Sequence, residues 1–144
     1  QQIGASMNLR ALELQKSLAQ AVSDAMQEPW ARIVVNYEML TTDEGREVDY
    51  CAFYISAADG DFRETSLRTL PDAVDDLFIQ LNDLMAKTEN ERWGTCDLVI
   101  DRSGQYKFNF DYAAPRRING VFDEQSQGRF DRYLDTYRTE RAGG

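Results

Sequence analysis

The sequence predicts an α+β fold, in which an antiparallel sheet of four or five strands has helices packed mainly on one face. Two observations carry this prediction. Residues 93–112 alternate apolar and polar side chains as a β-hairpin does, and two longer stretches repeat apolar residues at helical spacing. The consecutive strands lack the crossover helices that parallel pairing requires. The expected order of elements is therefore α-β-β-(β)-α-β-β-α.

The hairpin at 93–112 has one apolar face and one polar face. The apolar positions fall at every second residue: Cys96, Leu98, Ile100, Tyr106, Phe108, Phe110 and Tyr112. Between the two runs, Asp101 can bond the turn backbone and Gly104 can adopt the positive φ that a tight turn needs. Phe108 and Phe110 are thus expected to face the buried layer. Lys107, Asn109 and Asp111 alternate with them and are expected to be solvated.

The first 56 residues predict a helix followed by two strands. Apolar residues recur at three- and four-residue spacing from Asn8 to Met26, and Pro29 ends this helix. The strand at 31–40 places Ile33, Val35, Tyr37 and Met39 on one face. A polar turn at 41–45 leads into a partner strand at 48–55, VDYCAFYI. Both of its faces are largely apolar, which predicts a central strand that is covered on both sides at least in part.

The remaining elements are a short strand and two helices. Residues 62–67 form a possible third strand. Pro71 and the acids after it begin a helix that runs to about Lys87, with a core face formed by Val74, Leu77, Phe78, Leu81, Leu84 and Met85. Phe130, Tyr133, Leu134 and Tyr137 mark a final helix that ends near Arg141.

Length and composition predict one domain over residues 7–142, because 144 residues with 42% hydrophobic content can bury one core. Residues 1–6 are expected to be a vector-derived or disordered tail before Met7. No apolar run approaches the ~20 residues of a membrane span. We therefore expect a cytoplasmic protein that does not bind membranes.

Chemistry-bearing motifs are scarce. The chain has no histidine, and it lacks a phosphate-binding glycine loop, a nucleophile elbow, a Cys-x-x-Cys pair and a calcium loop. Cys51 and Cys96 stand alone within predicted strands and are expected to be reduced thiols, although they could approach each other if their strands are adjacent. No catalytic, metal-binding or cofactor-binding residue is predicted. A carboxylate-dependent enzyme acting on a small molecule remains an alternative.

The distribution of charge predicts a basic partner. The net charge is −9; residues 1–94 hold 17 acidic and 8 basic side chains, whereas residues 95–144 hold 8 of each. An acidic surface repels nucleic acid and anionic lipid, so direct binding to nucleic acid is not expected. The alternative explanation is that the acids only keep the protein soluble.

An ordered set of residues resembles the YezG-like immunity protein family of bacterial toxin systems. The set comprises Pro29-Trp30, Tyr37-Glu38, Tyr50 with Phe53, LFIQLNDLM at 77–85, Trp93 before Cys96, and Phe110-Asp111-Tyr112. The resemblance to the family's layout covers roughly residues 20–140, and Ala113-Ala114-Pro115 departs from the family pattern. The resemblance implies an antitoxin that takes part in bacterial competition. Such a protein binds a cognate toxin domain, often a nuclease, and neutralises it by stoichiometric occlusion without catalysis or a cofactor.

Two acidic segments are the predicted partner-binding residues. On the helix at 72–87, Asp72, Asp76, Ile79 and Asp83 share the face opposite the core, and Asp75 lies at its margin. An exposed isoleucine among acids resembles a small binding hot spot with a charged rim. The alternative is that Ile79 only covers a neighbouring loop. Asp43 and Glu44 are further candidates, because hairpin tips project.

Overall fold

The computed structural model describes residues 2–57, 64–66, 69–122 and 129–143. Eight helices and strands follow one another in the order predicted from the sequence. In chain order they are α1 (Gln2–Asp24), β1 (Trp30–Thr42), β2 (Gly45–Ser56), β3 (Glu64–Ser66), α2 (Asp72–Glu89), β4 (Thr95–Asp101), β5 (Tyr106–Asp111) and α4 (Arg129–Gly143).

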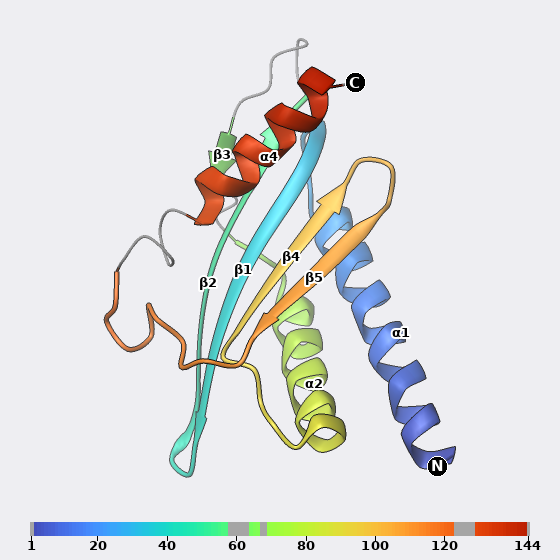
Figure 1. Cartoon of the computed structure of the whole chain (residues 1–144), viewed down its shortest axis with the longest axis vertical. Coiled ribbons are helices and arrows are strands. Elements are labelled where there is room, and N and C mark those ends of the chain that lie inside the picture. Colours follow the sequence, from blue (N-terminus) through green and yellow to red (C-terminus); the bar gives the residue numbers. More distant parts are fainter. Residues whose placement is uncertain (1, 58–63, 67–68, 123–128, 144) are drawn as a thin grey trace.

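The strands form one antiparallel sheet in the order β3-β2-β1-β4-β5 (Figure 1). This confirms the predicted α+β fold, including the short third strand. The prediction that the strand at 48–55 is central and covered at least in part is confirmed for its second half, where β2 lies between β1 and β3. β1 lies in the centre and is buried almost continuously from Trp30 to Met39, whereas β2 is exposed from Gly45 to Asp49. The apolar second half of β2 is buried because β3 and the C-terminal helix lie beside it.

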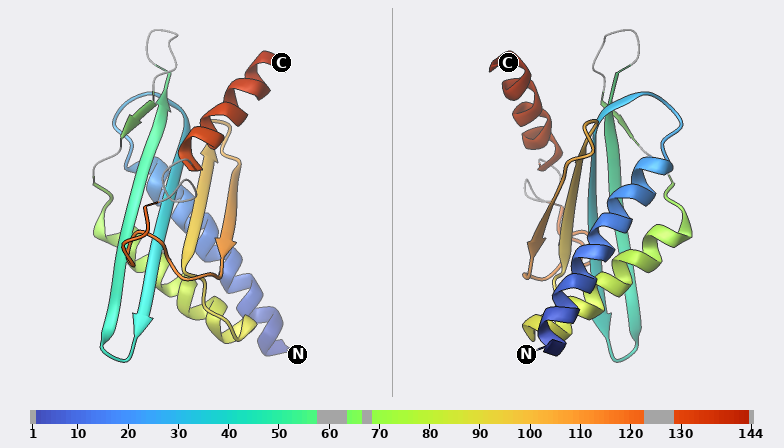
Figure 2. Two further views of the ribbon diagram at one scale, coloured as in Figure 1. Left: turned by 60° about the vertical axis from the view of Figure 1, so that its left-hand side comes forward. Right: turned by 90° about the vertical axis from the view of Figure 1, so that its right-hand side faces the viewer.

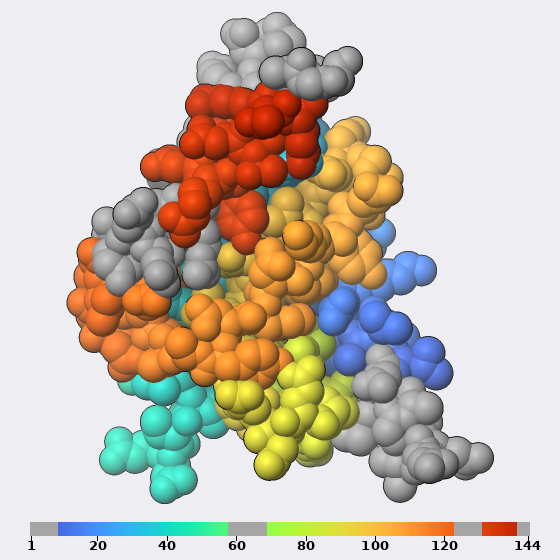
Figure 3. Space-filling view, viewed as in Figure 1, coloured from blue at the N-terminus to red at the C-terminus, as the bar shows by residue number. Residues whose placement is uncertain are grey.

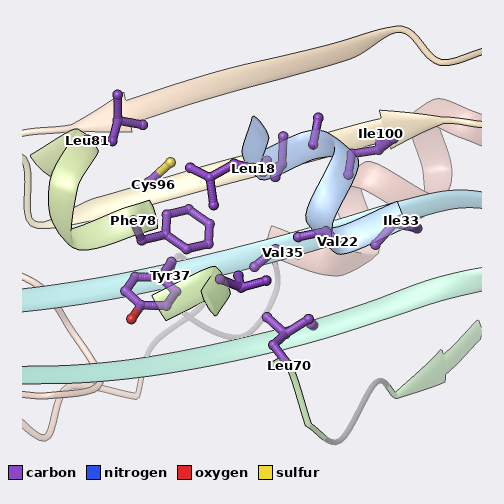
Figure 4. Close-up of a cluster of buried hydrophobic side chains, with 14 of the residues drawn as sticks. Leu18, Val22, Ile33, Val35, Tyr37, Leu70, Phe78, Leu81, Cys96 and Ile100 are labelled. Carbon is purple, nitrogen blue, oxygen red and sulfur yellow. The ribbon is translucent and has the colours of Figure 1, made fainter. Parts of the chain in front are cut away.

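The main core lies between the sheet and the helices α1 and α2, which cross one face of it (Figure 2). Phe78 from α2 stacks on Tyr37 of β1, and Leu18 and Val22 from α1 lie in the same cluster (Figure 4). The β1 residues in this layer are those predicted: Ile33, Val35, Tyr37 and Met39. The apolar spacing of both helices therefore identified their buried faces correctly. α1 begins at Gln2, before the predicted start at Asn8.

α4 packs on the opposite face of the sheet, at the end where β1 begins (Figures 1 and 2). Leu134 and Tyr137 form a second small cluster there with Ile55, and Ala31 packs against it. The helices thus lie mainly on one face, as predicted, and among the described residues one shorter helix, α4, lies on the other. None of the helices among the described residues is long and apolar enough to cross a lipid bilayer.

Two glycines explain how the hairpin of β4 and β5 is closed and anchored. Gly104 has a φ of 95° and donates its N–H to the Asp101 carbonyl at 2.9 Å, which closes the predicted turn. Gly94 lies against the following loop, where a Cβ would come within 2.5 Å of the Ala113 carbonyl oxygen. Any larger residue at Gly94 would therefore push this loop away from the sheet.

Candidate functional site

The end of the β1–β2 hairpin projects from the body of the molecule (Figures 1 and 3). We call residues 40–49 the arm. Pairing between β1 and β4 stops at Glu38, followed by one bond from the Met39 N–H to the Gly94 carbonyl at 2.9 Å. Every residue from Thr41 to Asp49 is exposed. The predicted residues Asp43 and Glu44 form the tip of the arm, in the turn between Thr42 and Gly45.

The five predicted residues on α2 have different environments. Asp72 and Asp76 are exposed, Asp75 and Asp83 are half-buried, and Ile79 is half-buried and packs against the main core. Asp75 accepts a hydrogen bond from the Tyr37 hydroxyl at 2.6 Å. Asp83 accepts bonds from Arg46 at 2.8 Å and from Arg92 at 2.5 Å. Ile79 therefore does not stand out from the surface as the sequence pattern indicated.

The structure brings the arm and α2 together on the helix-covered side of the sheet. Arg46 of the arm reaches Asp83 in the middle of α2, and the Leu70 N–H, just before α2, donates to the Tyr50 hydroxyl at 2.9 Å. These contacts connect the helix to β2 at two points. The two predicted acidic segments, which are far apart in the sequence, therefore belong to neighbouring parts of one surface.

The other face of the sheet holds a buried polar network that the sequence did not indicate. Glu38 is 2% exposed, and its carboxylate binds Arg117 Nη1 at 3.0 Å and the Ile118 N–H at 3.0 Å. Arg117 also donates to Asp49 at 2.7 Å and to the Asn36 side chain at 2.5 Å. Asn36 in turn donates to Asp97 at 2.5 Å.

This network attaches the C-terminal third of the chain to the sheet. Tyr133 on α4 donates to Asp97 at 2.8 Å. Nearby, Arg32 binds Asp101 at 2.6 Å and Glu140 on α4 at 2.8 Å. The only available sequence signal was the alternation of Arg32, Asn36 and Glu38 with the core residues of β1, which equally describes solvated positions. The buried carboxylates are thus engaged in structural contacts.

A cleft of about 290 Å³ lies between α4 and the polar face of β4 and β5. Arg32 and the two acids that it binds, Asp101 and Glu140, contribute to its wall together with Lys107, Asn109 and Tyr133. Asn109 donates to the Tyr133 hydroxyl at 3.2 Å, so this predicted solvated position also contacts α4. Within the described residues, no group of three or more Asp, Glu, Cys or His side chains is arranged to hold a metal ion.

The two cysteines are free thiols on separate strands. Cys51 on β2 is opposite Asn36, and Cys96 on β4 is opposite Tyr37, so β1 runs between them. Two strand spacings of about 4.8 Å exceed the reach of a disulfide. Burial raises the pKa of both thiols, well above the ordinary value for the enclosed Cys96, where Asp97 adds to the effect. Neither cysteine therefore has the environment of a reactive thiolate.

Comparison with known proteins identifies the family. A search of curated proteins found no significant match. The family model described as "Immunity protein YezG-like" matches residues 55–133, which is more than half of the chain and includes α2, the β4–β5 hairpin and the start of α4. This match agrees with the resemblance found in the ordered motifs of the sequence. The chain therefore belongs to the YezG-like immunity protein family.

Proposed function

We propose that this chain is an immunity protein that binds a cognate bacterial toxin domain and neutralises it by stoichiometric occlusion in the cytoplasm. The observation that carries the proposal is the family match over residues 55–133. An occluding protein needs no catalytic group. The engagement of the buried carboxylates Glu38 and Asp97 by Arg117, Asn36 and Tyr133 is consistent with a structural role for these acids.

We further propose that the toxin domain has a basic binding surface, as the substrate clefts of nucleases do. The exposed acids Asp43, Glu44, Asp72 and Asp76 lie on the arm and on the neighbouring helix α2. Acidic side chains in this position attract a basic surface and accelerate its association. Asp75, Ile79 and Asp83 belong to the same proposed surface, where their contacts with Tyr37, Arg46 and the core hold α2 in place.

The direct test uses the protein encoded by the adjacent gene. The two proteins are co-expressed with a tag on one of them, and the adjacent-gene product is also expressed alone to measure its toxicity. We expect the pair to co-purify and growth to be restored only when this chain is present. A toxic adjacent-gene product that neither binds this chain nor is neutralised by it would contradict the proposal.

A further inference from the structure

We propose that the outer edge of β2, from Arg46 to Tyr50, binds an extended basic segment of the toxin as an added strand of the sheet. The inference rests on the proposed function, because it names how the partner is held. It goes beyond an acidic surface because it assigns the recognition to backbone hydrogen bonds along one strand edge. Strand addition of this kind takes its affinity from the main chain and its specificity from alternate side chains.

The register of the hairpin determines which backbone groups face outward. Thr42 pairs with Gly45 across the two-residue turn, and Leu40 pairs with Glu47. In an antiparallel pair the hydrogen-bonded positions alternate, so Gly45, Glu47 and Asp49 bond to β1, whereas Arg46 and Val48 direct their N–H and C=O groups away from it. Met39, which is opposite Val48, should likewise direct its backbone groups away from β2. It does so, because its N–H donates to the Gly94 carbonyl on the opposite side of β1.

The outward groups of Arg46 and Val48 lie on an open edge. Among the described residues, β3 pairs only with Phe53–Ile55 of β2, and no strand pairs with the outer side of β2 before that point. Val48 is 42% exposed, and the arm stands clear of the rest of the surface in the space-filling view (Figure 3). An unpaired edge with exposed backbone groups is a template for another strand.

The acidic side chains around this edge favour a basic strand as the binding partner. Asp43, Glu44, Glu47 and Asp49 are all exposed. Asp49 is paired with Arg117 at 2.7 Å, and the one cation of the arm, Arg46, is bound to Asp83. Two copies of this chain paired through β2 would bring acids against acids, which opposes self-association. A strand that carries Lys or Arg would instead meet opposite charges along its length. The chemistry of the edge therefore fits a basic segment of a different protein better than a second copy of this chain.

The alternation of β2 also predicts the pattern of the added strand. Val48 and Tyr50 point to the side covered by α2, where Asp76 is exposed and Ile79 is half-buried. Glu47 and Asp49 point to the other side, as their register with Leu40 and Glu38 shows. The matching segment should therefore place Lys or Arg where it faces Glu47, and apolar side chains at the adjacent positions that face Val48 and Tyr50.

Hydrogen exchange provides the first test, with the adjacent-gene protein as the probe. In the unbound chain the amides of Arg46 and Val48 should exchange quickly, whereas the amide of Glu47 should be protected by β1. Binding should slow exchange at Arg46 and Val48 at least ~tenfold and leave Glu47 nearly unchanged. A complex that forms without this alternating protection would overturn the edge inference and leave the proposed function intact.

A proline variant provides the second test. Val48→Pro removes an outward N–H that β1 does not use, a position where an edge strand tolerates proline. Val48→Thr is the matched control, because it keeps the N–H and the β-branched shape. We expect Val48→Pro to weaken binding to the adjacent-gene protein at least ~tenfold and Val48→Thr to change it little, with both variants folded by circular dichroism.

Each other outcome has a distinct meaning. Equal binding by Val48→Pro and its parent would overturn the edge inference alone. Loss of binding by Val48→Thr as well would show that the side chain, not the backbone edge, is recognised. Failure of the parent chain to bind a toxic adjacent-gene protein would overturn the proposed function and this inference with it. Protection of Arg46 and Val48 that rises with concentration of the chain alone would assign the edge to self-association.

Discussion

At the scale of single residues, the buried pair of Glu38 and Arg117 connects parts of the chain that the sequence pattern treats as independent. Glu38 alternates with core residues on β1 and therefore looks solvated in the sequence. It is buried because the loop after β5 places Arg117 over it, with side-chain exposures of 2% for Glu38 and 8% for Arg117. Apolar periodicity shows which face of a strand a residue occupies. It does not show that a distant segment, here the loop after β5, covers that face.

The first prediction concerns this pair. Arg117→Met should reduce the free energy of unfolding by about 3–5 kcal/mol, because it leaves the Glu38 carboxylate buried without its cation. Lys107→Met, at an exposed position on β5, should change stability by less than about 0.5 kcal/mol. Urea denaturation measures both. Adding Glu38→Met to Arg117→Met should recover part of the loss, and a loss below ~1 kcal/mol for Arg117→Met would show that the pair contributes little.

The second prediction concerns Cys96. Burial raises the pKa of its thiol in the folded chain, so above the ordinary thiol value of ~8.5 the folded state retains a proton that the unfolded state releases. The stability from this group is complete below that pH and is lost progressively as pH rises from that value towards the raised pKa of the folded state. Urea denaturation at pH 7 and at pH 10 should show a smaller alkaline loss for Cys96→Ala than for the parent. Identical pH slopes in the two proteins would contradict the burial of this thiol.

At the scale of elements, the β4–β5 hairpin was predictable because its alternation and its turn are local. How deeply each of its two strands is buried could not be predicted. Leu98 on β4 is fully buried, whereas Phe108 opposite it on β5 is half-buried, because β5 is the edge of the sheet. In the same way, the apolar pattern of β2 predicted an interior strand, but it did not show that β3 covers only the second half and leaves Gly45–Asp49 exposed.

The third prediction uses this cross-strand pair. Leu98→Ala should reduce the free energy of unfolding by about 3–5 kcal/mol, as for fully buried aliphatic residues. Phe108→Ala should reduce it by about 1–3 kcal/mol, because part of the ring already contacts water. Thermal or urea denaturation ranks the two variants. A larger loss for Phe108→Ala would mean that β5 is more enclosed than its place at the sheet edge indicates.

The fourth prediction concerns the acidic face of α2. Reversing the charge of Asp72 and Asp76 together to Lys should slow association with the adjacent-gene protein about fivefold or more at low salt, and the difference should shrink at high salt. Asp131 and Asp135 on α4 are the matched control, since they are also exposed, one turn apart and in or next to the first turn of a helix. Equal slowing by both pairs would mean that net charge, not this surface, sets the rate. Ile79→Asp is unsuitable as a test because Ile79 packs against the core.

At the scale of the whole molecule, the fold and the family could both be identified from the sequence, and the arrangement of the candidate site could not. The order of strands and helices follows from local spacing, and the motifs from Leu77 to Tyr112 lie within the residues that the family model matches. That Asp43 and Asp76 lie on neighbouring parts of one surface depends on the contact of Arg46 with Asp83. A contact between an exposed arginine and one of many acids has no signature in the sequence.

The central claim is that the chain acts by stoichiometric binding, and the most direct test is a titration. A fixed amount of the toxic adjacent-gene protein is mixed with increasing amounts of this chain, and its residual activity is followed. Stoichiometric binding predicts that toxin activity falls linearly and reaches its end point near one equivalent of this chain. The end point should be about the same with and without a metal chelator. Neutralisation of many toxin equivalents by one molecule of this chain would contradict it, because only a catalyst could produce that result.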